Sequence, residues 1–108
     1  MKADYLTVND LDENGAPNGG YASGMGMGIV WQKGPLGRGS NRIQPNGAFV
    51  ETVIDAVIKR IEFYQGTKFN CAENEAALGY LRRAAEALDS RTKAREAQAV
   101  EGTHAVHA

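Results

Sequence analysis

The chain has 108 residues, of which 43% are apolar, and its formal net charge is −1. This length fits one small domain, which buries a modest fraction of its surface, so association between copies would add buried area. The near-neutral charge excludes a protein that coats nucleic acid through an overall positive charge, although a local basic patch remains compatible with it.

The chain carries one cysteine, Cys71, so no disulfide can form within it and an oxidising compartment is not indicated. The N-terminal residues lack the apolar stretch of a signal peptide, and no apolar run approaches the roughly 20 residues of a membrane helix. We therefore expect the protein in the cytoplasm, away from membranes.

Composition changes sharply near Asn46. Ten of the 13 glycines and all three prolines lie between Gly15 and Gly47, whereas helix-forming residues dominate the rest of the chain. We predict a single α+β domain, in which a small N-terminal antiparallel β element precedes a long antiparallel helical hairpin. Its parts are a glycine-rich β and loop region over 1–46, the hairpin over 47–98 and a tail over 99–108.

The glycine-rich region contains two predicted strands, a short one over 5–8 and a longer one over 25–32 with a β-branched and aromatic centre. Between them, Asn14-Gly15 and Asn18-Gly19 are strong turn dipeptides. Residues 34–39 hold three glycines and a proline, so we expect a loop there.

The first helix is predicted over 47–64, where apolar residues recur at three- and four-residue steps. Asn46 is a good N-cap for this helix, and Gly66 is a good terminator.

The second helix is predicted over 71–98, and Asn70 with Glu73 reads as a capping box at its start. Only a few residues separate the two helices, so they are expected to lie antiparallel. A narrow stripe runs along the second helix and consists of Cys71, Asn74, Leu78, Leu81, Ala85 and Leu88.

Lys33, Arg38 and Arg42 lie in a segment, residues 23–46, that contains no acidic residue. Guanidinium groups on a flexible glycine-rich backbone suit phosphate binding, and a solvated basic loop is the alternative. The glycines at 24–28 do not form a dinucleotide-binding loop, because they lead into a strand instead of following one.

Arg91 and Arg95 have no acidic residue at three- or four-residue spacing, and an external anion would relieve their mutual repulsion. An ordinary exposed helix end is the alternative. Asn74, on the apolar stripe, is either a satisfied core group or a ligand contact. Tyr64, at the end of the first helix, is either a core-rim residue or a ring on which a base stacks.

His104 and His107 do not indicate a metal site, because the single cysteine is far away and no third ligand is evident. No serine or cysteine has a histidine and a carboxylate placed to activate it, so we expect neither an enzyme nor a cofactor.

Five segments carry a resemblance to known proteins, residues 31–35, 45–51, 69–76, 90–95 and 100–104. Through them the chain resembles a bacteriophage family of anti-defence sponges, small helical-hairpin proteins that sequester cyclic-nucleotide alarm signals. The family has anti-CBASS and anti-Thoeris branches, and only the anti-Thoeris branch carries an N-terminal sheet before the hairpin, as expected here.

The resemblance implies that the protein binds cyclic ADP-ribose isomers made by TIR-domain enzymes, without cleaving them. It implies that Asn74 and Arg91 contact the ligand, that Tyr64 stacks on adenine, and that Arg38 or Arg42 meets the pyrophosphate, with Arg38 favoured. It also implies, for some members, a separate site for CBASS cyclic trinucleotides on a hexamer. Here the matching residues of that second site are Arg95, Gly102, Thr103 and His104.

Asn74 and Arg91 lie roughly 25 Å apart along one continuous helix at about 1.5 Å per residue, too far for one cyclic ADP-ribose. We therefore expect a binding unit of at least two chains, in which Asn74 of one copy lies near Arg91 of the other. Two other functions stay open, a phage structural or adaptor protein that assembles through the hairpin and a small enzyme that degrades the nucleotide.

Overall fold

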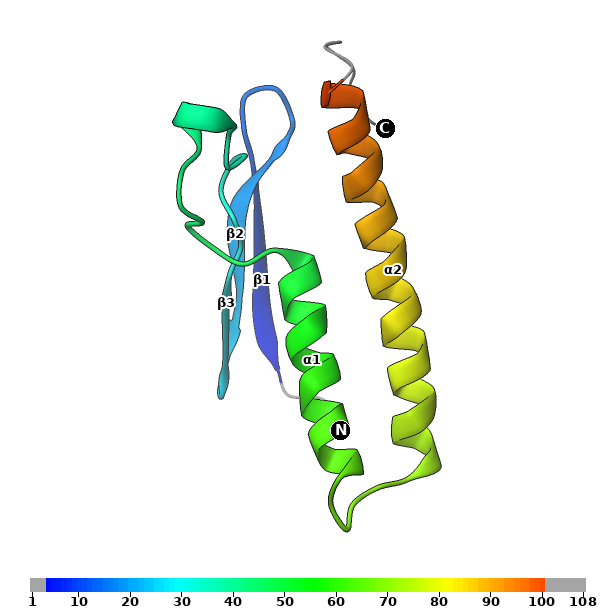
Figure 1. Cartoon of the computed structure of the whole chain (residues 1–108). Helices are drawn as coiled ribbons and strands as arrows, with labels where there is room; N and C mark the ends of the chain where they lie inside the picture. Colours follow the sequence, from blue (N-terminus) through cyan, green and yellow to red (C-terminus); the bar gives the residue numbers. More distant parts are fainter. Residues whose placement is uncertain (1–3, 101–108) are drawn as a thin grey trace. The chain divides into compact units, whose positions relative to one another are not determined.

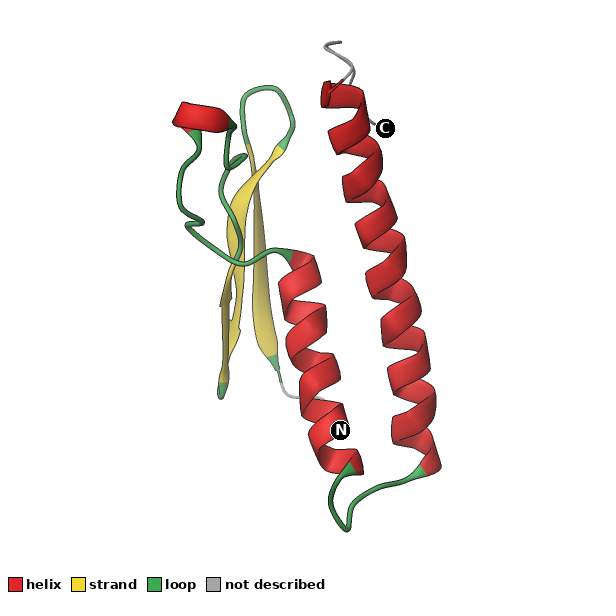
Figure 2. Cartoon of the chain, viewed as in Figure 1, coloured by secondary structure: helices red, strands yellow, loops and turns green. Residues whose placement is uncertain are grey.

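The computed structural model describes residues 4–100, which divide into two compact units at the Val50–Glu51 peptide. An N-terminal sheet is followed by two helices, so the predicted α+β class with a helical hairpin is confirmed (Figures 1 and 2). No helix within residues 4–100 combines the length and apolar character that a membrane crossing requires. The elements in chain order are β1 (Tyr5–Leu11), β2 (Pro17–Gly24), β3 (Met27–Val30), the 3-10 helix η1 (Gly39–Asn41), α1 (Val50–Gln65) and α2 (Ala72–Val100).

The sheet of the first unit has the strand order β1-β2-β3, and both pairs are antiparallel. Val8, Tyr21 and Val30 face one another in a row across all three strands. Strand β1 begins at Tyr5 as predicted and continues past residue 8 to Leu11. Strand β2 was not predicted, because its first residues contain the turn dipeptide Asn18-Gly19.

The predicted turn at Asn18-Gly19 is wrong, because both residues lie inside β2. Gly19 and the following Gly20 have positive φ values of 86° and 123°, and the β1–β2 pairing shifts between Asn9 and Leu11. The glycines therefore serve an irregularity within a strand pair, of the β-bulge kind, and do not reverse the chain. The reversal is at Asn14-Gly15, as predicted, where Gly15 has a φ of 80°.

The second predicted strand is shorter in the structure, since β3 begins only at Met27. Met25 and Gly26 form the turn between β2 and β3, and Gly26 supplies the positive φ of 80° that this turn requires. Residues 34–38 are a loop as predicted, whereas Gly39, the last residue of the predicted loop, begins η1. The backbone of Trp31 pairs with that of Ala48 in an isolated parallel bridge.

Asn46 does not cap the first helix, which begins at Val50 instead of residue 47. Its side chain is committed elsewhere, because Asn46 Oδ1 accepts a hydrogen bond from the Lys33 N–H at 2.7 Å. Asn46 Nδ2 also donates to the Lys33 carbonyl oxygen at 3.1 Å. These two bonds join the ends of the segment from Lys33 to Asn46, which contains Arg38 and Arg42. The helix ends at Gln65, just before Gly66 as predicted.

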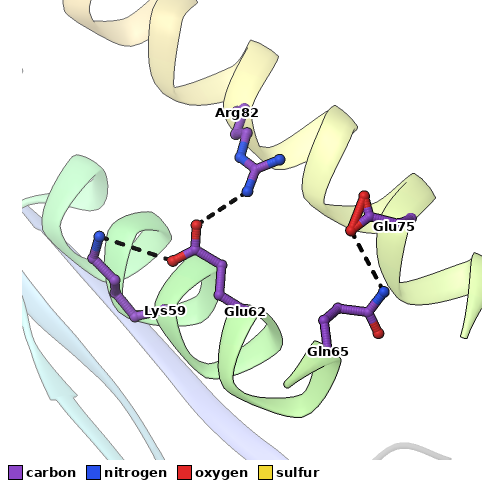
Figure 3. Close-up of polar contacts among 5 residues, drawn as sticks. All are labelled: Lys59, Glu62, Gln65, Glu75 and Arg82. Carbon is purple, nitrogen blue, oxygen red and sulfur yellow. Dashed lines mark hydrogen bonds and ion pairs between the residues drawn. The ribbon is translucent and has the colours of Figure 1, made fainter. Parts of the chain in front are cut away.

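In the second unit, α1 and α2 are antiparallel, because rising positions on α1 meet falling positions on α2 (Figures 1 and 3). Polar contacts between the helices include Glu51–Arg91 at 3.5 Å, Glu62–Arg82 at 3.0 Å and Gln65–Glu75 at 3.5 Å.

Ile58 of α1 and Leu78 of α2 are buried, and Leu78 is only 1% exposed. Both lie on the helix faces that carry the interhelical contacts, given the helical repeat. Leu81, Ala85 and Leu88 of the predicted stripe are half-buried, as expected for a packing face.

Two predictions at the start of α2 are wrong. Cys71 is exposed and lies just before the helix, so it is not part of the buried stripe. The Asn70 amide donates to the Thr67 carbonyl oxygen at 2.8 Å, and is thus used inside the connection instead of in a capping box with Glu73. Gln65 closes this connection, since its side-chain oxygen accepts from the Cys71 N–H and its nitrogen donates to the Cys71 carbonyl, both at 3.0 Å.

Candidate ligand-binding site

Arg91 lies on α2 opposite the first turn of α1, where its guanidinium is 3.5 Å from the Glu51 carboxylate. The sequence spacing correctly gave Arg91 no acidic neighbour on its own helix, but the structure supplies one from the other helix. Both side chains are over one-third exposed, which makes this a weak, solvent-screened pair. The guanidinium is therefore accessible to an anion that competes with Glu51.

Tyr64 lies at the opposite end of α1, near the connection between the helices, and is 37% exposed. Arg60 approaches it from one turn earlier, donating from Nε to the Tyr64 hydroxyl at 3.2 Å. The Arg60 guanidinium carbon is also 5.0 Å from the Tyr64 ring centroid and 5.1 Å from that of Phe63. A partly exposed aromatic ring beside a cation can accept a nucleobase by stacking.

Asn74 is half-buried in the first part of α2, and its Nδ2 lies 3.4 Å from the Phe69 carbonyl oxygen. This bond is long, and the carboxamide has further hydrogen-bonding capacity for a ligand. Asn74 and Tyr64 thus both lie near the connection end of the hairpin, whereas Arg91 lies toward the far end. One chain does not gather the three predicted contacts, because α2 is a single continuous helix from Ala72 to Val100.

Arg38 and Arg42 flank the 3-10 helix η1 in the first unit. The Ile43 N–H donates to the Leu36 carbonyl oxygen at 2.7 Å and closes this loop. Gly37 requires glycine here, since its φ is 82° and a Cβ would lie 2.6 Å from the Asn41 carbonyl oxygen. Within residues 4–100 neither arginine side chain has an ion pair or hydrogen bond, so their charges are open to an anion.

Only one residue of the predicted second site, Arg95, lies in the described part of the chain, where it is exposed. Gly102, Thr103 and His104 lie outside the described residues, as does His107. Among residues 4–100, no three histidine, cysteine or acidic side chains gather as a metal site would need.

Neither Glu51 nor Arg60 was predicted as a site residue. The spacing of Arg60 to Phe63 and Tyr64 is itself a sequence signal, because side chains three and four positions apart meet on a helix. The pairing of Glu51 with Arg91 depends on the register of the two helices, which spacing along one helix does not reveal.

These features define a small α+β helical-hairpin protein whose candidate site offers arginine, amide and aromatic side chains. It is similar to the protein named Thoeris anti-defense 1 of Bacillus phage SBSphiJ7, with 44% identity over 59 residues. The match covers 55% of this chain and 42% of the relative, so the chain spans less than half the length of that protein. The resemblance to phage anti-Thoeris proteins is thereby confirmed. No family model matches the chain.

Proposed function

We propose that this protein counters Thoeris immunity during phage infection by binding the cyclic ADP-ribose signal and holding it away from its receptor. The similarity to Thoeris anti-defense 1 carries the proposal, since the name of that relative states an anti-Thoeris function. In this account the protein acts in the cytoplasm of the infected bacterium and performs no chemistry on the ligand.

The chemistry of the candidate residues supports such a ligand. A cyclic ADP-ribose offers an adenine ring, ribose hydroxyls and a pyrophosphate. Guanidinium groups bind pyrophosphate through forked, charge-assisted hydrogen bonds, which suits Arg91 and the Arg38/Arg42 loop. An aromatic ring binds adenine by stacking, which suits Tyr64. The Asn74 carboxamide can donate and accept hydrogen bonds with base or ribose.

The proposed binding unit is a pair of chains. Asn74 and Arg91 lie roughly 25 Å apart on α2, at about 1.5 Å per residue, and a single cyclic ADP-ribose does not span that distance. Two copies packed antiparallel bring Asn74 of one chain near Arg91 of the other. Twofold symmetry then creates two equivalent sites per dimer.

A second site for cyclic trinucleotides is a further part of the proposal, and it involves a hexamer. Arg95 is its one residue inside the described part of the chain, where this residue is exposed. An exposed arginine suits a phosphodiester.

Calorimetric titration tests the proposal with cyclic ADP-ribose isomers, linear ADP-ribose, ATP and a cyclic trinucleotide as ligands. We expect at least one cyclic ADP-ribose isomer to bind with one ligand per chain, and linear ADP-ribose and ATP to bind far more weakly. Absence of binding to every cyclic ADP-ribose isomer contradicts the proposal and favours an adaptor that assembles through the hairpin. Binding of the trinucleotide alongside a bound isomer supports a separate second site.

A further inference from the structure

Arg60, Phe63 and Tyr64 form an exposed cluster at the end of α1, and Arg60 makes three contacts within it. Its Nε donates to the Tyr64 hydroxyl at 3.2 Å. Its guanidinium carbon lies 5.0 Å from the Tyr64 ring centroid and 5.1 Å from that of Phe63. The two ring centroids are 6.1 Å apart, with an angle of 49° between the ring planes.

This cluster differs from the other cation–ring contacts of the second unit. Lys68 lies 5.5 Å from the Phe69 ring, and Arg83 lies 5.9 Å from the Tyr80 ring, each as a single contact. Isolated contacts of that kind are common on protein surfaces. Arg60 instead joins a directional hydrogen bond to two ring contacts.

Arg60 has no acidic partner among the described residues, unlike Arg82 and Arg91, which pair with carboxylates on α1. Its orientation therefore rests on the two aromatic side chains. In turn, the hydrogen bond to the hydroxyl and the contact with the ring restrict the rotation of the Tyr64 side chain. An exposed ring that is already held in one rotamer loses less conformational entropy when a ligand stacks on it.

We propose that Arg60 is a positioning residue that holds the Tyr64 ring ready to stack on the adenine of the ligand. This inference rests on the proposed function and assigns to the Tyr64 hydroxyl a role that stacking alone does not require. Stacking needs only the ring, so on that basis Tyr64→Phe would be silent. If Arg60 acts through the hydroxyl, removal of either group loosens the ring and weakens adenine binding.

The test is a double-mutant cycle with calorimetry and the cyclic ADP-ribose isomer that binds wild type best. We expect Arg60→Gln and Tyr64→Phe each to weaken binding about three- to tenfold, the scale of one hydrogen bond and one cation–π contact. The double variant should bind the ligand with the same affinity as Arg60→Gln, since both changes remove the same restraint on the Tyr64 ring. Arg60→Lys keeps the charge but lacks the Nε donor, so it should not restore binding.

Arg83→Gln is the matched control, because it removes an exposed arginine from a ring that the proposal does not involve. It should bind like wild type. Thermal unfolding of every variant checks that the hairpin is intact, and Arg60→Lys serves if Arg60→Gln fails to fold.

Three results overturn the inference while leaving the proposed function in place. In the first, Arg60→Gln binds the ligand with wild-type affinity although Tyr64→Ala has lost binding. In the second, Arg60→Lys binds with wild-type affinity. In the third, the losses of affinity in Arg60→Gln and Tyr64→Phe multiply in the double variant. The last two would mean that Arg60 acts on the ligand directly through its charge. A wild-type protein that binds no cyclic ADP-ribose isomer contradicts the proposed function itself, and the inference with it.

Discussion

Arg91 of α2 lies 3.5 Å from Glu51 of α1, so the carboxylate occupies part of the guanidinium that the proposed ligand would use. A pyrophosphate must compete with this internal anion. Because the pair is more than one-third exposed on both sides, its own stability is low, and a ligand can displace it at little cost. We therefore expect Glu51 to compete with an anionic ligand for the Arg91 guanidinium and to lower the affinity of the site for that ligand.

The first prediction concerns these two residues. Arg91→Ala should weaken cyclic ADP-ribose binding by about 1.5–3 kcal/mol, the scale of hydrogen bonds to charged groups. Glu51→Gln should instead tighten binding by up to about 1 kcal/mol, the upper range for an exposed ion pair. Calorimetry at two salt concentrations measures both.

Glu62→Gln is the control for this comparison, because Glu62 pairs with Arg82, which the account leaves outside the site (Figure 3). Its affinity should match that of wild type. Weaker binding in Glu51→Gln would show that the carboxylate orients Arg91 for the ligand, contrary to the competitor role.

The second prediction is that the site is shared between chains. Asn74→Ala and Arg91→Ala should each bind poorly alone. After the two variants are unfolded and refolded together, mixed dimers should carry one intact site out of two and regain partial binding. A mixture that regains nothing, or a monomer in sedimentation that binds as well as wild type, would refute the shared site.

The third prediction concerns the interior of the hairpin. Leu78 is the most deeply buried large side chain described, with 1% of its surface exposed. Leu78→Ala should lower the free energy of unfolding by about 2–5 kcal/mol, through lost burial and a residual cavity. Urea denaturation measures this, with Tyr80→Ala as the control on the same helix, because Tyr80 is 68% exposed. A near-neutral Leu78→Ala would contradict the packing of the hairpin described above.

The fourth prediction concerns the irregular pairing of β1 and β2. Gly20 has a φ of 123°, and a Cβ there would lie 2.1 Å from the Val8 carbonyl oxygen. Gly20→Ala should therefore lower the free energy of unfolding by about 1–3 kcal/mol, the cost of one strained backbone position. Gly28→Ala is the matched control in β3, since nothing lies within 4 Å of its Cβ position. Equal melting temperatures for the two variants would contradict this assignment.

The sequence predicted the elements whose signal is local. The apolar repeat after residue 47 and the glycine that follows Gln65 were sufficient for α1, and the stripe through Leu78 was sufficient for the packing face of α2. Strand β2 was not predicted, because the glycines at its start are typical of a turn. Only the pairing of this segment with β1 shows that Gly19 and Gly20 lie within a strand.

The candidate site divides in the same way. The loop that contains Arg38 and Arg42 was predicted from a segment without acidic residues. In the structure a hydrogen bond from the Ile43 N–H to the Leu36 carbonyl oxygen closes this loop. The capping role of Asn46 was wrong because the Lys33 backbone competes for its side chain from outside the helix. The pairing of Arg91 was hidden because its partner belongs to the other helix. In each case a long-range contact decided what a local pattern left open.

The most direct test of the central claim is recovery of the ligand. Excess protein is incubated with the cyclic ADP-ribose isomer that binds best, the free ligand is separated by filtration, and the retained complex is heat-denatured and filtered again. Sequestration without catalysis predicts that the first filtrate is depleted and that the second releases the cyclic compound intact, as measured by mass spectrometry. Ligand that stays in the first filtrate, or that emerges from the second as linear ADP-ribose, would contradict the account.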